Sequence, residues 1–146
     1  SGARDEGPGL SDEERAAALG LLRDPNLVTR ILTDAPTDNQ GQGSAFSPTD
    51  LCALSLTTCI VTTMGIYANM KDFPILAAEA TTHKHMANDP RRIARIEVHL
   101  TLTLAADATE RHEEGLRRIA NTCPVSRSLH PDIDQDVHLT FLRAEA

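Results

Sequence analysis

The sequence is poor in aromatic side chains: only 3% of its 146 residues are aromatic, and tryptophan is absent. Proteins that bind single-stranded nucleic acid stack the bases on aromatic side chains, so the composition argues against this class. The formal net charge of −7 also argues against nucleic acid and anionic membranes, which attract basic surfaces. We therefore expect neither nucleic acid nor a membrane among the partners of the chain.

Cysteine is scarce as well, with three residues at irregular spacing: Cys52, Cys59 and Cys123. A small and odd number of cysteines argues against a secreted scaffold held together by disulfides. The chain also lacks a glycine-rich phosphate loop, and no Ser-His-Asp set stands out. The polar, charged start at Ser1–Glu6 does not have the pattern of a signal peptide. These features predict a soluble cytoplasmic protein, and they imply no cofactor.

The length of the chain suits a single domain with a hydrophobic core. We expect residues 1–9 to be a disordered leader and residues 10–146 to form that domain. A capping-box pattern predicts a short helix over Ser11–Leu22, and residues 27–33 have the pattern of a strand. Prolines and glycines among polar residues then predict a loop over residues 34–46.

The segment Ser47-Pro48-Thr49-Asp50 is a favourable helix start, because Ser47 can cap the helix and Pro48 fits its first position. We expect this helix to extend to about Met70. Residues 51–70 are uncharged and reach the length of a membrane span, but their serines and threonines make them too polar for one. Because the segment is apolar or small almost all round, we expect a long, buried central helix.

The rest of the chain alternates between strand and helix patterns. Residues 75–86 and 93–104 predict two antiparallel strands joined by a turn, and the second strand alternates regularly between apolar and polar side chains. Residues 107–121 predict a helix, and Pro124 is expected to begin a short helical turn to about residue 129. Residues 133–142 predict a further strand. The predicted fold class is α+β, with antiparallel pairing around the buried helix.

Two of the cysteines lie in settings that suggest thiol chemistry. Cys59 lies inside the long helix, and Cys123 directly precedes Pro124, where the N–H groups and positive end of a helix stabilise a thiolate. Cys52 is roughly 10 Å from Cys59 along a helix, too far for a disulfide, and we expect it to be a small core residue. No local rule brings Cys59 and Cys123 together, so two inert buried thiols remain the alternative.

A thiol that reduces peroxides must be a thiolate, must oxidise to a sulfenic acid and must then be resolved by a second thiol. A low pKa for the first thiol requires a nearby cation or helix end. Arg23 and Arg30 are candidate cations for Cys59, and Asp50 is a candidate to hold such an arginine through a bidentate ion pair. The alternative for each arginine is a solvated surface charge.

Histidines suggest a second kind of site. His83 and His85 lie two residues apart in a predicted strand, so both side chains lie on one face, and His99 on the partner strand makes a metal site conceivable. No carboxylate or cysteine with ligand spacing joins them, and ordinary surface histidines are the favoured interpretation. His130, after the short helix that follows Cys123, is expected to serve a turn, with an electrostatic effect on that thiol as the alternative.

Several segments taken together resemble one protein family. They are Ser47-Pro48-Thr49-Asp50-Leu51 with Cys59 eight residues on, Thr122-Cys123-Pro124-Val125, Ser128-Leu129-His130-Pro131, Thr33-Asp34-Ala35-Pro36, Gly43-Ser44-Ala45-Phe46 and Met64-Gly65-Ile66. From about residue 31 to the C-terminus, the sequence resembles the OsmC/Ohr family of thiol-dependent peroxidases.

The resemblance implies an intertwined homodimer in which each subunit places a long central helix against a curved antiparallel sheet, with two active sites at the subunit interface. It implies that Cys59 is the peroxidatic cysteine and Cys123 the resolving one. The implied reaction reduces an organic hydroperoxide to its alcohol. An external dithiol, such as a lipoyl group, would then reduce both cysteines.

The sequence departs from the family pattern ten residues before the reactive cysteine. Where better-studied members have a glutamate that holds an arginine over the thiolate, this chain has Thr49, and the acid is Asp50, one residue later. Arg23 matches that arginine best by position, and Arg30 is second. Another interpretation on the same fold is a non-enzymatic redox sensor or a protein that binds a small apolar ligand. A metal-binding protein that uses the histidine pair is a third.

Overall fold

The computed structural model describes residues 31–145. Its elements in chain order are η1 (Thr37–Asn39), α2 (Pro48–Met70), β1 (Ile75–Ala87), β2 (Arg92–Leu104), α3 (Glu110–Ala120), α4 (Pro124–Ser128) and β3 (Asp134–Arg143). The expected leader at residues 1–9 and the helix at 11–22 lie outside the described residues, as does most of the strand at 27–33. The last three residues of that strand, 31–33, are not in a strand. The chain divides into two compact units, Ser1–Leu51 and Cys52–Ala146.

In the first unit, Asp34 holds together the loop that was predicted before the long helix. The Asp34 carboxylate accepts hydrogen bonds from the Ser44 backbone N–H at 3.0 Å and from the Ser44 hydroxyl at 2.6 Å. These bonds hold the pKa of Asp34 below its ordinary value. Gly41 is required in this loop, since a Cβ there would lie 1.7 Å from the Ala35 carbonyl oxygen.

The start of α2 has the cap that the sequence predicts. The Asp50 backbone N–H donates to the Ser47 hydroxyl oxygen at 3.1 Å, and the Ser47 N–H donates back to the Asp50 carboxylate at 2.9 Å. This reciprocal arrangement is a capping box in which aspartate takes the place of the usual glutamate. Pro48 occupies the first helical position, where the absence of an N–H costs no hydrogen bond.

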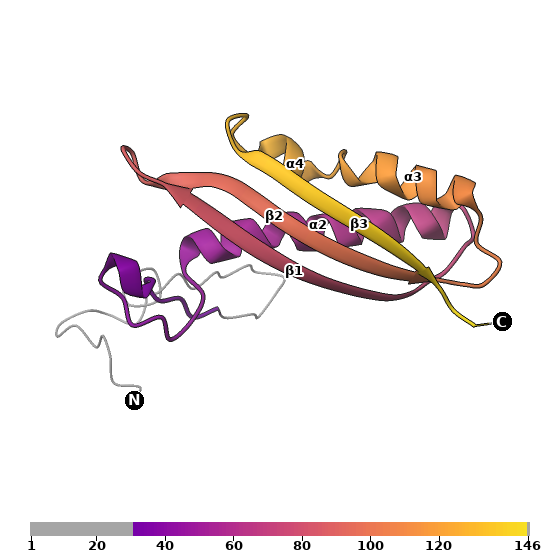
Figure 1. The fold of residues 1–146 in the computed structure, drawn as a ribbon, viewed down its shortest axis with the longest axis horizontal. Coiled ribbons are helices and arrows are strands. Elements are labelled where there is room, and N and C mark those ends of the chain that lie inside the picture. Colours follow the sequence, from indigo (N-terminus) through magenta and orange to yellow (C-terminus); the bar gives the residue numbers. More distant parts are fainter. Residues whose placement is uncertain (1–30, 146) are drawn as a thin grey trace, which may run out of the picture. The chain divides into compact units, whose positions relative to one another are not determined.

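The second unit is built on a three-stranded sheet in the order β1-β2-β3 (Figure 1). β1 and β2 form the predicted antiparallel hairpin, with Thr81 opposite His99. β3 pairs with the other edge of β2 in parallel, with His138 opposite His99. The prediction of a wholly antiparallel sheet is therefore wrong, and the sheet is mixed. The reason is the connection through α3 and α4, which returns the chain to the starting end of β2 before β3 begins.

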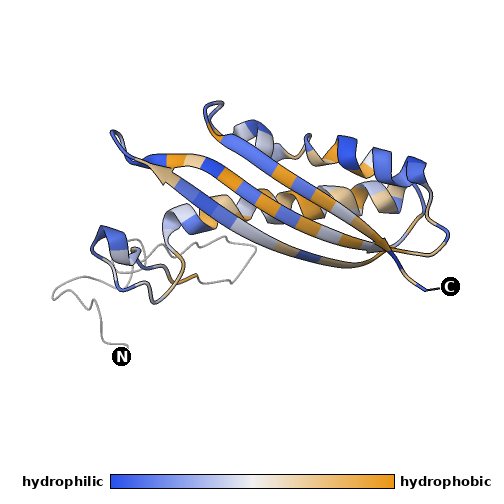
Figure 2. Ribbon diagram, in the orientation of Figure 1, coloured by the Kyte–Doolittle hydropathy of each residue, from blue (hydrophilic) through white to orange (hydrophobic). Residues whose placement is uncertain are grey.

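The hydrophobic core of this unit lies between α2, α3 and the inner face of the sheet. Hydrophobic and hydrophilic residues alternate along β2 (Figure 2). Alternate hydrophobic side chains of this strand point into the core and are at most 1% exposed: Ile96, Val98, Leu100, Leu102 and Leu104. α2 supplies a stripe at helical spacing: Ala53, Leu56, Thr57, Ile60, Met64 and Ala68. From α3, Leu116 and Ala120 complete the core, and β3 adds partly buried side chains. The inner face predicted for residues 93–104 is thus confirmed.

Within a single chain, α2 is buried on one side only. On that side, the Thr57 hydroxyl shares a 2.6 Å hydrogen bond with the hydroxyl of Thr82 in β1. On the opposite side, Ile66 and Met70 are 56% and 75% exposed. The expectation of a helix buried almost all round is therefore not confirmed. By length and composition alone, α2 is the one helix among residues 31–145 that meets the criteria for a membrane span, which core helices of soluble proteins also meet.

α3 lies within the helix predicted for residues 107–121, begins after the N-cap Thr109 and packs closely on α2. Thr109 and His112 form a reciprocal capping box, and the His112 ring stacks on Phe73 with ring centroids 4.1 Å apart. A Cβ at Gly115 would lie only 1.9 Å from the Tyr67 hydroxyl oxygen. The close approach of α3 to α2 therefore depends on a glycine at this position.

Candidate thiol site

The two cysteines singled out by the sequence lie on different elements of the second unit. Cys59 lies in the middle of α2 and is partly buried against the core. Cys123 is 0% exposed and forms the N-cap of α4. Together with the half-buried Cys52, both are free thiols.

The fold brings Cys59 and Cys123 together, although they are far apart in the sequence. The two thiols are close enough for the Cys59 side chain to influence the pKa of Cys123 directly. Burial raises the pKa of Cys123, the Ser126 backbone N–H acts against this rise, and the Cys59 side chain adds to it. Cys123 is therefore held as a protonated thiol near neutral pH.

The local sequence around α4 fixes the direction of the Cys123 side chain. Its Sγ atom accepts a hydrogen bond from the Ser126 backbone N–H at 3.3 Å, as a serine oxygen would at a helix cap. Pro124 follows at the first helical position. The helix start predicted beside Cys123 is confirmed, but the predicted thiolate is not. Burial in the core outweighs the backbone N–H groups of Ser126 and Val125, so the pKa rises rather than falls.

Only part of the predicted activating set lies in the region that the structure describes. Asp50 is found in the first turn of α2, where its carboxylate accepts the hydrogen bond from Ser47. Arg23 and Arg30 lie outside the described residues. The activation of Cys59 by an arginine therefore stays a prediction.

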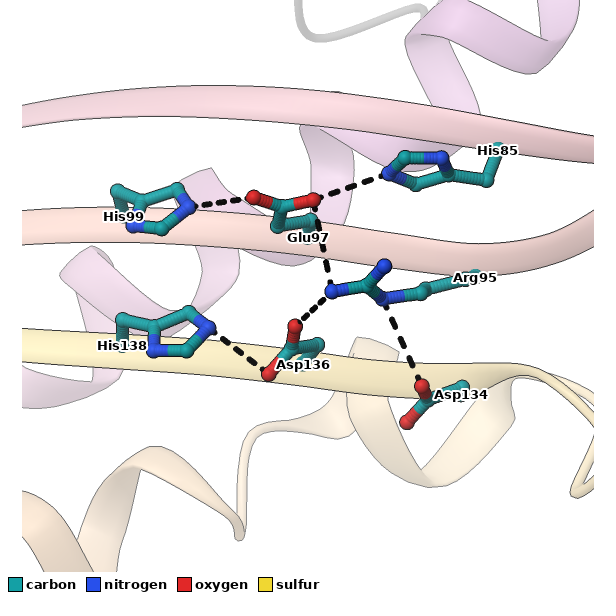
Figure 3. A network of polar contacts seen from close by, with 7 residues as sticks. All are labelled: His85, Arg95, Glu97, His99, Asp134, Asp136 and His138. Carbon is teal, nitrogen blue, oxygen red and sulfur yellow. Dashed lines mark hydrogen bonds and ion pairs between the residues drawn. The ribbon is translucent and has the colours of Figure 1, made fainter.

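The outer face of the sheet carries a second polar cluster, which we call the outer network (Figure 3). It consists of seven side chains from all three strands: His85, Arg95, Glu97, His99, Asp134, Asp136 and His138. Glu97 in the middle lies 2.6 Å from His99 and 3.0 Å from His85. Hydrogen bonds from His99 and His85 lower the pKa of Glu97 from its ordinary 4.5 to about 2.

Arg95 connects β2 to β3 within the outer network. Its guanidinium lies 3.5 Å from Glu97 and 3.6 Å from Asp134, and it forms a short hydrogen bond with Asp136. Asp136 also lies 2.9 Å from His138. The hydrogen bond from Arg95 lowers the pKa of Asp136, and that from His138 lowers it further. Opposite charges on facing strands thus favour the parallel register of β3 on β2.

The histidines of this face do not form a recognisable metal site. The His99 ring stacks on His138 at 4.6 Å between centroids and meets the His83 ring edge-on at 6.4 Å. Among residues 31–145, no group of three or more His, Cys, Asp or Glu side chains has an arrangement that would hold a metal ion. The His130 ring, on the turn before β3, accepts a hydrogen bond from the Asp132 N–H at 3.1 Å, in keeping with the predicted turn role.

Sequence reasoning missed the outer network and the Ser126 contact to Cys123. A signal for the network was present in the sequence. Arg95 and Glu97 occupy the polar positions of one alternating strand, while Asp134 and Asp136 occupy polar positions of another. These charges meet only if the two strands are parallel, and the sequence analysis assumed antiparallel pairing.

The part of the chain that contains both thiols matches a known protein family. The family model described as "OsmC-like protein" matches residues 41–138, a range that contains both Cys59 and Cys123. No curated protein matches the chain.

Solved structures share the fold. A protein from Psychrobacter arcticus, named provisionally as an osmotic stress induced and detoxification response protein, is 43% identical, with 76% of this chain and 80% of that chain covered and a TM-score of 0.67. The organic hydroperoxide resistance protein OsmC of Legionella pneumophila is 17% identical, with 80% and 85% covered and a TM-score of 0.57. A Vibrio cholerae protein named for organic hydroperoxide resistance, with captopril in one active site, is 17% identical, with 79% of each chain covered and a TM-score of 0.56.

Proposed function

The chain belongs to the OsmC-like protein family, and we propose that it is a cysteine-dependent peroxidase that reduces organic hydroperoxides. The observation that carries the proposal is the contact between Cys59 and Cys123, two free thiols from distant parts of the sequence. Two of the structural neighbours are named for organic hydroperoxide resistance. At 17% identity they share the fold, and their names suggest the substrate class for this chain.

The different surroundings of the two thiols support different roles. Cys59 is only partly buried, so a peroxide can reach it, whereas Cys123 is fully buried and has a raised pKa. A thiolate is the nucleophile that attacks peroxides, so the more accessible Cys59 is the better peroxidatic residue. Asp50 and Arg23 are proposed to favour the Cys59 thiolate, with Arg30 as the second candidate for the arginine.

The proposed reaction has three steps. The Cys59 thiolate attacks the terminal oxygen of the hydroperoxide; the O–O bond breaks, the alkoxide takes up a proton to become an alcohol, and Cys59 is left as a sulfenic acid. The Cys123 sulfur then attacks the sulfenic sulfur, a disulfide forms, and the Cys123 proton and the hydroxyl group leave as water. An external dithiol, such as a lipoyl group, reduces the disulfide by thiol–disulfide exchange.

We further propose that two copies of the chain form a cytoplasmic homodimer. The outer side of α2 leaves Ile66 and Met70 more than half exposed, and a second copy would cover apolar side chains of this kind. Sedimentation of the purified protein would give twice the monomer mass. A monomer at all working concentrations would contradict this part of the proposal.

A turnover assay tests the peroxidase proposal. Consumption of cumene hydroperoxide in the presence of a reduced lipoyl dithiol should depend on the chain. Cys59→Ser should remove the activity, and Cys123→Ser should remove sustained turnover while a single oxidation of Cys59 persists. Cys52→Ser is the matched control and should leave the rate near that of the wild type. Equal rates for wild type and Cys59→Ser would contradict the proposal.

The wild type and the same cysteine variants also distinguish the peroxidase from the alternative interpretation. A non-enzymatic redox sensor or binder of small apolar ligands would show no turnover in any of these variants. It would instead be stabilised against heat by the ligand, because a ligand that binds only the folded state raises the melting temperature. That stabilisation would survive Cys59→Ser.

A further inference from the structure

A glutamine in β3 is bonded to the short helix that carries Cys123. The Ser126 hydroxyl donates a hydrogen bond to the Gln135 side-chain oxygen at 2.6 Å. In return, the Gln135 side-chain nitrogen donates to the Ser126 backbone carbonyl at 3.0 Å. Both residues are half-buried, so water competes little with this pair of bonds. The Gln135 side chain is therefore hydrogen-bonded to both the side chain and the main chain of Ser126.

Ser126 is also the residue that contacts the Cys123 sulfur. Its backbone N–H donates to the Cys123 Sγ atom at 3.3 Å. α4 has only five residues, and so short a helix is not stable by itself in water. The direction of the Ser126 N–H is therefore fixed by contacts to the rest of the fold. The two bonds to Gln135 are the side-chain hydrogen bonds that join this residue of α4 to the sheet.

We propose that Gln135 is a positioning residue for Cys123, which holds the Ser126 N–H on the Cys123 sulfur and thereby favours loss of the thiol proton. The inference rests on the proposed function for its consequence, because proton loss from Cys123 accompanies its attack on the sulfenic acid of Cys59. Gln135 touches neither thiol in this role. It acts only through Ser126.

The surroundings of Cys123 explain why the hydrogen bond from the Ser126 N–H matters. Burial and the neighbouring Cys59 both raise the pKa of Cys123, and the Ser126 N–H opposes them, with a smaller contribution from the Val125 backbone. A hydrogen bond to the charged form of a thiol lowers its pKa. Without Gln135, Ser126 would lose its two side-chain hydrogen bonds to the sheet. Its N–H would then be held less firmly on the Cys123 sulfur and would lower the pKa of that thiol less.

The first experiment measures the Cys123 thiolate directly. In a Cys52→Ser/Cys59→Ser background, the thiolate absorbance at 240 nm is followed with pH, and the same protein with Cys123→Ser supplies the baseline for tyrosine. Adding Gln135→Leu, which removes both bonds to Ser126, should raise the midpoint by about 0.5–1 pH unit. Adding Ser128→Ala is the matched control. Its hydroxyl bonds only the Pro124 carbonyl inside α4, and the midpoint should not move.

The second experiment separates the two chemical steps in the protein with all three cysteines. After one equivalent of cumene hydroperoxide, dimedone traps the sulfenic acid, while alkylation and mass spectrometry follow the disulfide. Gln135→Leu should leave the rate of sulfenic acid formation unchanged and slow disulfide formation about three- to tenfold. A general structural defect would slow both steps.

The two experiments separate a failure of the inference about Gln135 from a failure of the proposed function. If the wild type forms no sulfenic acid, the peroxidase proposal fails, and the titration alone decides the role of Gln135. An unchanged midpoint in folded Gln135→Leu would overturn the inference. If Gln135→Leu does not fold, Ser126→Ala takes its place. It removes one of the two bonds and keeps the backbone N–H, so a smaller rise in the midpoint supports the inference and no rise overturns it.

Discussion

The two faces of the sheet differ in what they contribute to the fold. The inner face of β2 is a continuous row of apolar side chains covered by α2 and α3, and the thiol pair lies against the same core. The outer face carries the outer network, in which Arg95 and Glu97 join charged groups of β2 to β1 and β3 (Figure 3). Burial on the inner face supplies most of the stability, whereas exposed ion pairs contribute little each. The outer network therefore favours the register of the strands more than it stabilises the fold.

The sharpest test of this contrast uses two neighbours on β2. Leu100 is 1% exposed on the inner face, and Thr101 follows it on the outer face. Leu100→Ala should lower the free energy of unfolding by about 2–5 kcal/mol, because it removes buried methyl groups and leaves a cavity. Thr101→Ala should change it by no more than about 0.5 kcal/mol. Urea unfolding measures both, and similar losses for the two variants would contradict the contrast.

A second test concerns how closely α3 packs on α2, the two helices that cover the inner face. Gly115→Ala places a Cβ within 1.9 Å of the Tyr67 hydroxyl and should cost about 1–3 kcal/mol of stability through overpacking. Gly65→Ala is the matched control, since a Cβ at Gly65 meets no heavy atom within 4 Å. Alanine is the better helix former, so this control should stabilise α2 by up to about 1 kcal/mol. Thermal unfolding measures both, and equal shifts in melting temperature for the two variants would contradict this expectation.

The smallest expected effect concerns the outer face and appears only in acid. The pKa of Glu97 is lowered to about 2, so its pairing contributes fully above its ordinary value of 4.5. That contribution is lost as the pH falls from about 4.5 towards 2. Glu97→Gln should therefore flatten the fall in urea midpoint over this range, and added salt should reduce the difference between variant and wild type. A variant that follows the wild-type curve would show that the outer network is not coupled to folding.

Most of the second unit was predictable, because its local patterns agree with its tertiary structure. The alternation over residues 93–104 correctly identifies β2 and its inner face. The direction of β3 was not predictable from alternation, since a strand has the same pattern read in either direction. The one-sided burial of α2 was also missed, because its outer side has apolar residues such as Ile66 and Met70 as well.

The thiol site was predictable only in part. The cap at Cys123 follows from Pro124 next in the chain, a local signal. The contact with Cys59 has no local signal and entered through the family resemblance. The raised pKa of Cys123 was missed because burial depends on how α4 packs on the core, which no local pattern reveals. The contribution of Gln135 likewise depends on the parallel return of β3.

Peptide mapping of the protein after one equivalent of cumene hydroperoxide would show directly whether the two thiols react with each other. We expect a single cross-linked pair of peptides joined through Cys59 and Cys123, with Cys52 still open to alkylation. A disulfide that uses Cys52, or Cys59 oxidised to the sulfinic acid while Cys123 stays reduced, would contradict it.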